Sequence, residues 1–252
     1  MHAPNFQSFE STSDPRNAAA RIEGLRTILL RDDVHGVLVP RADEHQGEYV
    51  AGYAERLSWL TGFTGSAGMA LIARQTAVIF VDGRYTEQVR LQTDPALFGY
   101  EDLVSNPPTA WIEANWKPGG KLGIDPWLHT IGEVERISAA LEKVGGELVM
   151  LEGNPVDAVR TDRPAPPLEP VLIHPVERAG VLARDKLAAL AAAVRDAGAD
   201  ACVLTDPSSL AWAFNIRGSD VPHTPLALGF AIVSAKGNHQ LFMDKRKMTR
   251  EV

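Results

Sequence analysis

The 252-residue chain contains a single cysteine and no long hydrophobic run. Without a second cysteine no intrachain disulfide can form. Because Cys202 lies in the apolar run ACVLT, we predict a buried, inert thiol rather than a nucleophile. No apolar stretch reaches the roughly 18 residues of a membrane-spanning helix. The N-terminus, MHAPNFQSFESTSDP, lacks a basic segment followed by an apolar core, so we predict neither a membrane span nor a secretory signal.

Basic residues are outnumbered by acidic ones, 25 against 32, which gives a net charge of −7. This balance argues against binding to nucleic acid or to an anionic membrane and predicts a cytoplasmic protein. A hydrophobic content of 45% with 23% charged residues is ordinary for a soluble globular chain and suffices for a sizeable core. The length lies between one domain and two.

The chain contains an internal duplication. LSWLTGFTGS, from Leu57, matches LAWAFNIRGS, from Leu210. Each copy continues into two apolar runs joined by a short polar turn and ends on Asp-x-Arg, first at Asp82 and Arg84 and then at Asp244 and Arg246. The period is about half the chain, far longer than a solenoid repeat, so we predict two related domains.

Helical and strand patterns alternate along the chain, which predicts an α/β fold with a largely mixed sheet in each domain. We place domain one at residues 1–153, a proline-rich linker at 154–170 and domain two at 171–252. The second domain is expected to be truncated. By analogy with the first copy, it lacks the helix and strands that should follow its Asp-x-Arg.

Local patterns fix several elements. Apolar residues at 18, 22, 25 and 29 predict a helix that begins near Asp14-Pro15. Residues 69–73 and 77–81 predict a hairpin. Thr130 and Glu133 form a capping box at the start of another helix, which Gly145-Gly146 ends.

The polar loop 41–48 carries Asp43, Glu44, His45 and Glu48, side chains that can bind divalent ions. A solvated acidic loop is the favoured interpretation, because no second cluster completes a coordination shell. Strand ends in α/β sheets do face functional crevices, so the loop stays a candidate for ligand or interdomain contact.

The run GFTGSAG, residues 62–68, is no phosphate loop, because no lysine follows it and a hairpin replaces the helix. Ser66 is not in a nucleophile elbow, since position 64 is Thr where Gly is needed. We predict instead that the glycines allow a positive-φ turn and close packing, with Ser66 as a local hydrogen-bonding residue.

Single charged residues have both structural and functional interpretations. Arg84 follows an Asp-Gly turn at a strand end, where it either points into a cleft and grips a carboxylate or carbonyl, or pairs with Asp82, or caps the next helix. Arg217 is expected to brace its loop by pairing with Asp220. His129 and His223 are predicted to occupy surface or bracing positions rather than catalytic ones.

Several motifs together resemble one family. RADEHQGEY, GFTGSAGMALI, VDGRYTEQ, VDAVRTDRP and LAWAFNIRGSDVPHTPLALGFAIV occur here in the order typical of the non-catalytic half of a three-domain cytosolic Xaa-Pro aminopeptidase (aminopeptidase P). The resemblance covers most of the chain, from about Arg21 to Asp244. It implies two related creatinase N-terminal-like domains, which agrees with the duplication.

The resemblance also implies a third, pita-bread domain, in which two Asp, one His and two Glu bind two metal ions, usually manganese. That domain is not in this sequence. We therefore expect no catalytic residue, no metal ligand and no cofactor here. Arg84, and less strongly His45, are the expected substrate-binding residues. The resemblance further implies N-terminal Xaa-Pro peptides as substrates, a role in walling the cleft, and a homodimer.

Two functions follow from these observations. In the first, the chain is a part of a metallopeptidase that is inactive alone and shapes the substrate site of the whole. In the second, it is a stand-alone binding or oligomerisation module without peptidase activity.

Overall fold

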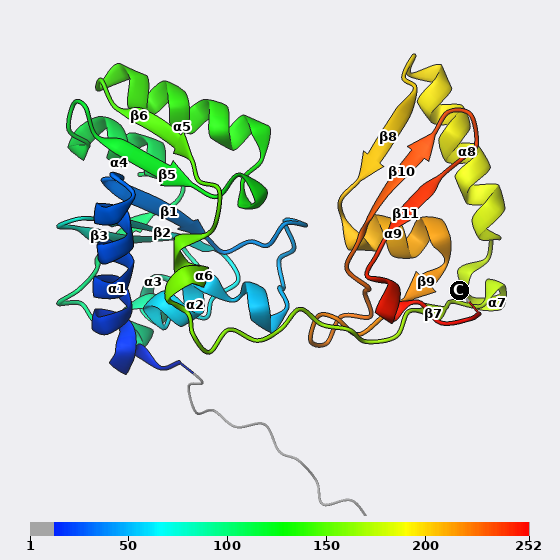
Figure 1. Cartoon of the computed structure of the whole chain (residues 1–252), viewed down its shortest axis with the longest axis horizontal. Helices are drawn as coiled ribbons and strands as arrows, with labels where there is room; N and C mark the ends of the chain where they lie inside the picture. Colours follow the sequence, from blue (N-terminus) through cyan, green and yellow to red (C-terminus); the bar gives the residue numbers. More distant parts are fainter. Residues whose placement is uncertain (1–12, 252) are drawn as a thin grey trace, which may run out of the picture. The chain divides into compact units, whose positions relative to one another are not determined.

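The computed structural model describes residues 13–251, and most of the N-terminal stretch MHAPNFQSFESTSDP lies outside them. The chain forms two compact units. The first contains the described residues up to Arg41 together with Glu55–Asp162, and the second contains Ala42–Ala54 and the residues from Arg163 onward. Figure 1 colours most of the first unit blue to green and most of the second yellow to red.

The first unit is built on one six-stranded mixed sheet, as predicted. Its strand order is β4-β3-β2-β1-β5-β6. β2 pairs antiparallel with β1 and β3, and the other pairs are parallel. The strands are β1 (Gly36–Pro40), β2 (Gly68–Ala73), β3 (Ala77–Val81), β4 (Gly99–Asp102), β5 (Lys121–Ile124) and β6 (Glu147–Met150).

Helices cover both faces of this sheet (Figure 1). α1 (Ala18–Arg31), α2 (Arg56–Thr61), α3 (Thr86–Gln92) and α6 (Pro155–Val159) bury apolar side chains against Val37, Val39 and Ile79. On the opposite face, α4 (Pro108–Asn115) and α5 (Ile131–Lys143) pack on Leu38, Leu71, Val78 and Phe80. Both faces are therefore sealed.

The helix ends follow the predicted signals. Asp14 caps a short 3-10 turn, η1 (Pro15–Asn17), that leads into α1. At α5 the Thr130 side chain accepts from the Glu133 amide while the Glu133 carboxylate accepts from the Thr130 amide, so the capping box is confirmed. Gly145, with φ 70°, follows the end of α5.

The second unit repeats the beginning of the first. Its sheet has the order β11-β10-β8, with both pairs antiparallel like β3-β2-β1. Its elements are α7 (Val176–Ala179), α8 (Ala183–Asp196), β8 (Ala201–Leu204), α9 (Pro207–Phe214), β10 (Phe230–Ser234), β11 (Gln240–Phe242), the short ribbon β7 (Leu172–Ile173) with β9 (Ile216–Arg217), and the 3-10 turn η4 (Lys245–Lys247).

Matched positions show that the duplication extends to detail. Gly62 ends α2 and Asn215 ends α9, and both adopt left-handed backbone with φ 90° and 51°. Arg21 donates to the Trp59 carbonyl, and its guanidinium carbon lies 4.5 Å from that ring. Lys186 likewise donates to the Trp212 carbonyl, over 3.1 Å, and lies 4.7 Å from the Trp212 ring.

One face of the second sheet lacks the cover seen in the first. Val203 lies opposite Ile232, and Phe230 opposite Phe242, so these four side chains share a face. Val203 is 63% exposed and Phe242 is 48% exposed, whereas Phe80, which precedes the first Asp-x-Arg as Phe242 precedes the second, is 0% exposed. Within the described residues of this unit, no helices stand where α4 and α5 cover the first sheet.

The predicted linker differs from the structure at its start. Residues 154–170 were expected to be irregular, but α6 forms within them and belongs to the first unit. Asn154 caps this helix, and Asp157 in it makes two 2.8 Å hydrogen bonds with Arg56 of α2. The proline-rich composition concealed a single helical turn held by a nearly buried ion pair.

Candidate functional site

Arg84 lies just beyond the carboxyl end of β3. Its Nη2 donates to Asp82 Oδ2 over 2.7 Å and its Nε to Oδ1 over 3.1 Å, while its backbone N–H donates to Oδ1 over 2.9 Å. Hydrogen bonding by the guanidinium lowers the pKa of the Asp82 carboxyl. The Arg84 side chain is nevertheless 62% exposed. The structure thus shows the predicted pairing with Asp82 and leaves the guanidinium accessible from solvent.

A stack of aromatic rings supports Arg84. Its guanidinium carbon lies 5.1 Å from the Tyr85 ring centroid, and the Tyr85 ring meets Phe63 edge-on at 5.6 Å. The Tyr85 hydroxyl lies 2.9 Å from Ser66 Oγ. Ser66 is therefore a local hydrogen-bonding residue, as predicted, and its partner is a tyrosine rather than a histidine base.

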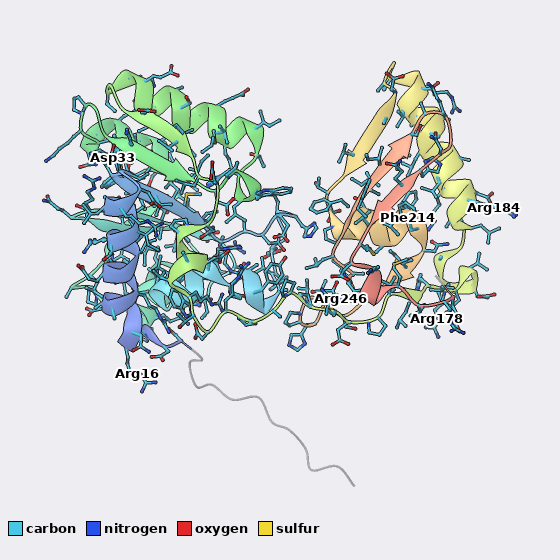
Figure 2. The ribbon with its side chains drawn as sticks, viewed as in Figure 1. Arg16, Asp33, Arg178, Arg184, Phe214 and Arg246 are labelled. Atoms are coloured by element: carbon cyan, nitrogen blue, oxygen red, sulfur yellow. The ribbon has the colours of Figure 1, made fainter. Side chains whose placement is uncertain are left out.

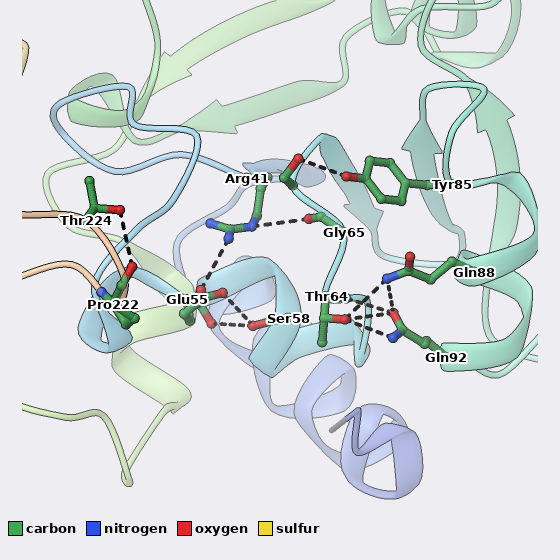
Figure 3. Close-up of polar contacts among 11 residues, drawn as sticks. Arg41, Glu55, Ser58, Thr64, Gly65, Tyr85, Gln88, Gln92, Pro222 and Thr224 are labelled. Carbon is green, nitrogen blue, oxygen red and sulfur yellow. Dashed lines mark hydrogen bonds and ion pairs between the residues drawn. The ribbon is translucent and has the colours of Figure 1, made fainter. Parts of the chain in front are cut away.

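Arg41 supports the glycine-rich loop 62–68 through a hydrogen bond to its backbone, a role that was not predicted from the sequence. Its Nη2 donates to Glu55 and its Nε to the Gly65 carbonyl, both over 3.3 Å (Figure 3). Its side chain is only 8% exposed. The available signal was its position as the first charged residue after the buried strand β1.

The other side of the loop is tied to α3. The Thr64 amide donates to Gln92 Oε1 over 3.0 Å, and Gln92 Nε2 donates back to the Thr64 hydroxyl over 2.8 Å (Figure 3). Gln88 also reaches the Thr64 hydroxyl. These bonds fix the loop as a rigid platform beside Arg84.

The second Asp-x-Arg repeats the geometry of the first. Arg246 Nε and Nη2 donate to the two Asp244 oxygens over 2.9 and 2.6 Å, and the Arg246 amide donates over 2.9 Å. These hydrogen bonds lower the pKa of Asp244. Figure 2 labels Arg246, in η4. The paired motif is therefore a structural feature of both strand ends.

His45 belongs to the second unit, although its sequence position precedes most of the first. Its Nδ1 lies 2.9 Å from the Thr205 carbonyl oxygen, and its ring stacks on Phe230 at 4.6 Å. Only 6% of the residue is exposed. The structure thus places His45 as a covering residue on the sheet of the second unit. Because Arg84 lies in the first unit, no single unit brings the two predicted residues together.

The carboxylates around His45 are occupied by local hydrogen bonds. Asp43 Oδ1 accepts from the amides of His45 and Gly47 over 3.0 and 3.1 Å. The Tyr53 hydroxyl donates to Glu44. Between residues 13 and 251, no three His, Cys, Asp or Glu side chains come together in a group that could hold a metal ion.

Two further predictions were wrong. Arg217 donates to the carbonyls of Ala211 and Ile216, and it is Lys247 that pairs with Asp220, inside the core of the second unit. Asp220 and Lys247 are too far apart in the sequence for their pairing to be predicted from local spacing. Cys202 is exposed rather than buried, because β8 is an edge strand of an open sheet.

The histidines were assigned to surface or bracing positions. His223 is exposed, at φ 60°. His129 differs, because it is only 8% exposed and neither ring nitrogen has a hydrogen-bond partner among the described residues. Burial lowers the pKa of His129, although Glu133 and Asp125 oppose the shift.

Comparison with known proteins matches both units to one domain type. The creatinase/prolidase N-terminal domain matches residues 21–161, and a second form of the same domain matches 162–252. The chain belongs to the creatinase/prolidase N-terminal domain family. The two creatinase N-terminal domains correspond to the duplication, so the predicted fold class and family resemblance are confirmed.

Several relatives of these creatinase N-terminal domains are much longer. The chain is 35% identical to a probable Xaa-Pro aminopeptidase P of Coccidioides posadasii, over 100% of this chain and 39% of that protein. It is 37% identical to aminopeptidase P2 of Arabidopsis thaliana, over 87% of this chain and 31% of that protein. The chain thus spans about two fifths or less of the length of these relatives.

A solved structure is similar over nearly the whole chain. The X-prolyl aminopeptidase of Caenorhabditis elegans, described as a cytosolic enzyme with a di-nuclear active site, superposes with a TM-score of 0.89 at 28% identity. The match covers 94% of this chain and 40% of that one. Within residues 13–251 no helix has the length and apolar character needed to cross a bilayer.

Proposed function

We propose that the chain is the non-catalytic N-terminal part of an Xaa-Pro aminopeptidase, a metallopeptidase that removes the N-terminal residue when the second residue is proline. The observation that carries the proposal is similarity over 87–100% of the chain to aminopeptidases P that are more than twice as long. A dinuclear metal centre in such an enzyme would activate water for attack on the peptide carbonyl. The described residues do not fit such a centre, because no three of their His, Cys, Asp or Glu side chains come together in a group that could hold a metal ion.

In this proposal the chain walls the active-site cleft and restricts substrates to short peptides with a free N-terminus. Arg84 is the residue best placed for contact with substrate, since its exposed guanidinium can receive a carboxylate or carbonyl. The stack on Tyr85 and the rigid loop 62–68 hold it in one position, which limits the entropy lost when a ligand binds. His45 has a smaller part, because its ring is already packed on Phe230.

One sheet face of the second unit is covered by His45 at Phe230 but exposed at Val203 and Phe242, and this supports membership of a longer protein. In the first unit the equivalent face is sealed by α4 and α5, and the sheet edges are extended by β4, β5 and β6. We expect residues that follow β11 in a longer chain to supply matching helices and strands over Val203, Ile232 and Phe242. We also propose a cytoplasmic homodimer with manganese in the catalytic part.

Kinetics on the longer protein test the role of Arg84. Arg84→Ala should lower kcat/KM for an Xaa-Pro peptide by roughly tenfold or more, the loss of a charged hydrogen bond to substrate. Stability should change little, because an exposed ion pair contributes about 0–1 kcal/mol. Arg246→Ala removes the same kind of pair from the other unit and should leave the rate unchanged. An unchanged rate in Arg84→Ala with an unchanged Tm would remove Arg84 from the proposal.

Assays on the 252-residue chain itself test the wider assignment. We expect no hydrolysis of an Arg-Pro-Pro type peptide by purified chain with added manganese. Turnover that follows the chain through purification would contradict the assignment to a non-catalytic part. A second possible function, a stand-alone module, would be favoured by a stable oligomer of the chain in the absence of any catalytic segment.

A further inference from the structure

A cavity of about 270 Å³ opens at the amino end of β1, in the first unit. Arg41 and Arg84 follow the carboxyl ends of β1 and β3, so this cavity lies at the opposite end of the sheet from them. It is formed by the end of the α1–β1 connection, the β2–β3 turn and the α4–β5 loop. The side chains that line it include His35, Arg74, Thr76, Trp111, Trp116 and Lys117.

One wall of the cavity is a tryptophan in a fixed position. Trp116 Nε1 donates to the Gly120 carbonyl over 3.1 Å. A Cβ added at Gly36 would lie 2.8 Å from the Trp116 ring, and one added at Gly120 would lie 2.7 Å from Nε1. The ring therefore lies against backbone positions at which an added Cβ would clash with it. This rigidity gives the cavity a preformed aromatic surface.

The hydrogen-bond donors of the cavity are also held in place. The Lys121 amide donates to His35 Nδ1 over 3.1 Å, which assigns the proton of the neutral ring to Nε2. Arg74 Nε donates to the Val34 carbonyl over 3.1 Å, so the plane of its guanidinium is fixed by the backbone. The cavity is thus bordered by oriented N–H groups.

The charged side chains that line the cavity are basic. Arg74 and Lys117 line it, and none of the described residues that line it carries a carboxylate. The nearest acidic partner, Asp33 (labelled in Figure 2), is 3.7 Å from Arg74 and makes its shorter contact, 2.6 Å, with Lys121. In a chain with a net charge of −7, such a site favours an anion.

We propose that this cavity binds a small planar aromatic carboxylate, with its ring against Trp111 and Trp116 and its carboxylate at Arg74 and Lys117. Guanidinium groups bind carboxylates through paired hydrogen bonds, and indole faces accept flat rings in offset stacks. The volume equals about nine water molecules at ~30 Å³ each, which suits one fused ring system with one carboxyl group. The site is independent of the proposed peptidase role.

Titration with indole-3-acetate tests this site in the 252-residue chain. The ¹⁵N-labelled protein has five indole N–H signals, one per tryptophan. We expect the signals of Trp111 and Trp116 to shift together and saturate with a Kd of about 1 mM or lower, the affinity typical of a ligand this small. The signals of Trp59, Trp127 and Trp212 should remain in place.

Two variants separate binding from a general effect on the fold. Arg74→Gln combined with Lys117→Gln should weaken binding at least fivefold, and Lys117→Gln alone, a change at an exposed side chain, should weaken it about twofold. Lys245→Gln makes the same charge change at an exposed residue of the second unit and should have no effect.

The ligand controls are neutral indole and inorganic phosphate, and both should bind at least fivefold more weakly than indole-3-acetate. The absence of saturation up to 10 mM indole-3-acetate would overturn the proposal. Equal binding of phosphate, equal binding of neutral indole, or equal affinity in Lys117→Gln and the wild type would overturn it as well.

Discussion

Gly65 lies where two aromatic rings approach the backbone of the loop 62–68. A Cβ at this position would lie 2.2 Å from Phe63 Cζ and 2.9 Å from Tyr85 Cδ1. These distances are far inside van der Waals contact, so the rings that support Arg84 can assemble only on a residue without a side chain. The loop glycines were predicted to permit close packing, and Gly65 shows which contact requires it.

Gly65→Ala should therefore lower the free energy of unfolding of the first unit by about 1–3 kcal/mol, the usual cost of overpacking. Chemical denaturation followed by circular dichroism measures the change. Gly83→Ala is the matched control, because an added Cβ there meets nothing within 4 Å. Equal stabilities for the two variants would show that the Phe63 and Tyr85 rings can move aside without lowering the free energy of unfolding.

His129 gives the first unit a dependence on pH. Burial lowers the pKa of its ring in the folded state, while the unfolded ring keeps a pKa of about 6.5. As the pH falls below that unfolded value, the unfolded chain binds a proton first, so stability is lost on acidification. The loss is at most about 1.4 kcal/mol per pH unit. It ends once the pH is below the folded pKa.

Denaturant unfolding at pH 7.5 and at pH 5.5 tests this linkage. The wild type should be less stable at the lower pH, and His129→Gln should show a smaller difference between the two conditions. Identical pH differences in the two proteins would mean that His129 does not titrate as its burial suggests.

At the scale of single elements, a cation joins the first long helix of each unit, α1 or α8, to the short helix α2 or α9. In the second unit Lys186 of α8 donates to the Trp212 carbonyl and, over 2.7 Å, to Asn215 Oδ1 at the end of α9. Lys186 is 6% exposed and Asn215 is 7% exposed, so this second hydrogen bond lies away from bulk water.

Lys186→Met should destabilise the second unit by about 1–3 kcal/mol, since it leaves the buried Asn215 Oδ1 and the Trp212 carbonyl without this donor. Arg184→Met changes a cation on the same helix whose side chain is 80% exposed (Figure 2), and it should stay within about ±0.5 kcal/mol. Thermal unfolding of the two variants side by side decides the matter. If Lys186→Met leaves the stability unchanged, packing against the Trp212 ring, and not the two hydrogen bonds of Lys186, holds α8 to α9.

The elements of the first unit were largely readable from sequence because their signals are local. Apolar spacing located α1, the capping box located the start of α5, and two short apolar runs joined by a polar turn located β2 and β3. The ribbon β7–β9 was missed because two strands of two residues carry no periodicity. The placement of His45 on Phe230 was missed because a contact between residues so far apart in sequence leaves no local pattern.

At the scale of the whole molecule, the two units are unequal copies. Phe80 and Phe242 hold corresponding places before Asp82 and Asp244, yet one is buried completely and the other is half exposed. The difference in exposure between these two side chains reflects how much of each sheet is covered. Its effect on stability can be measured without knowledge of any ligand.

Phe80→Ala should lower the stability of the first unit by about 3–5 kcal/mol, as expected for a large buried side chain. Phe242→Ala should cost less than about 1 kcal/mol in the 252-residue chain, where that side chain still meets water. In a longer protein that supplies the missing cover, the cost of Phe242→Ala should rise towards that of Phe80→Ala. Hydrogen exchange assigns each loss to its unit, and equal costs in both chain lengths would contradict a covering segment.

The Ala42–Ala54 segment has a practical consequence for anyone who wishes to study the halves apart. A gene divided after Asp162 would give two polypeptides. The segment with His45, whose ring stacks on Phe230, would then be part of the upstream polypeptide although it belongs to the second unit. The downstream product would begin without a part of its own interior, and the upstream product would carry a loop with nothing to fold against. A gene that joins Ala42–Ala54 directly to the residues from Arg163 onward, rather than simple division, is the route to an intact second half.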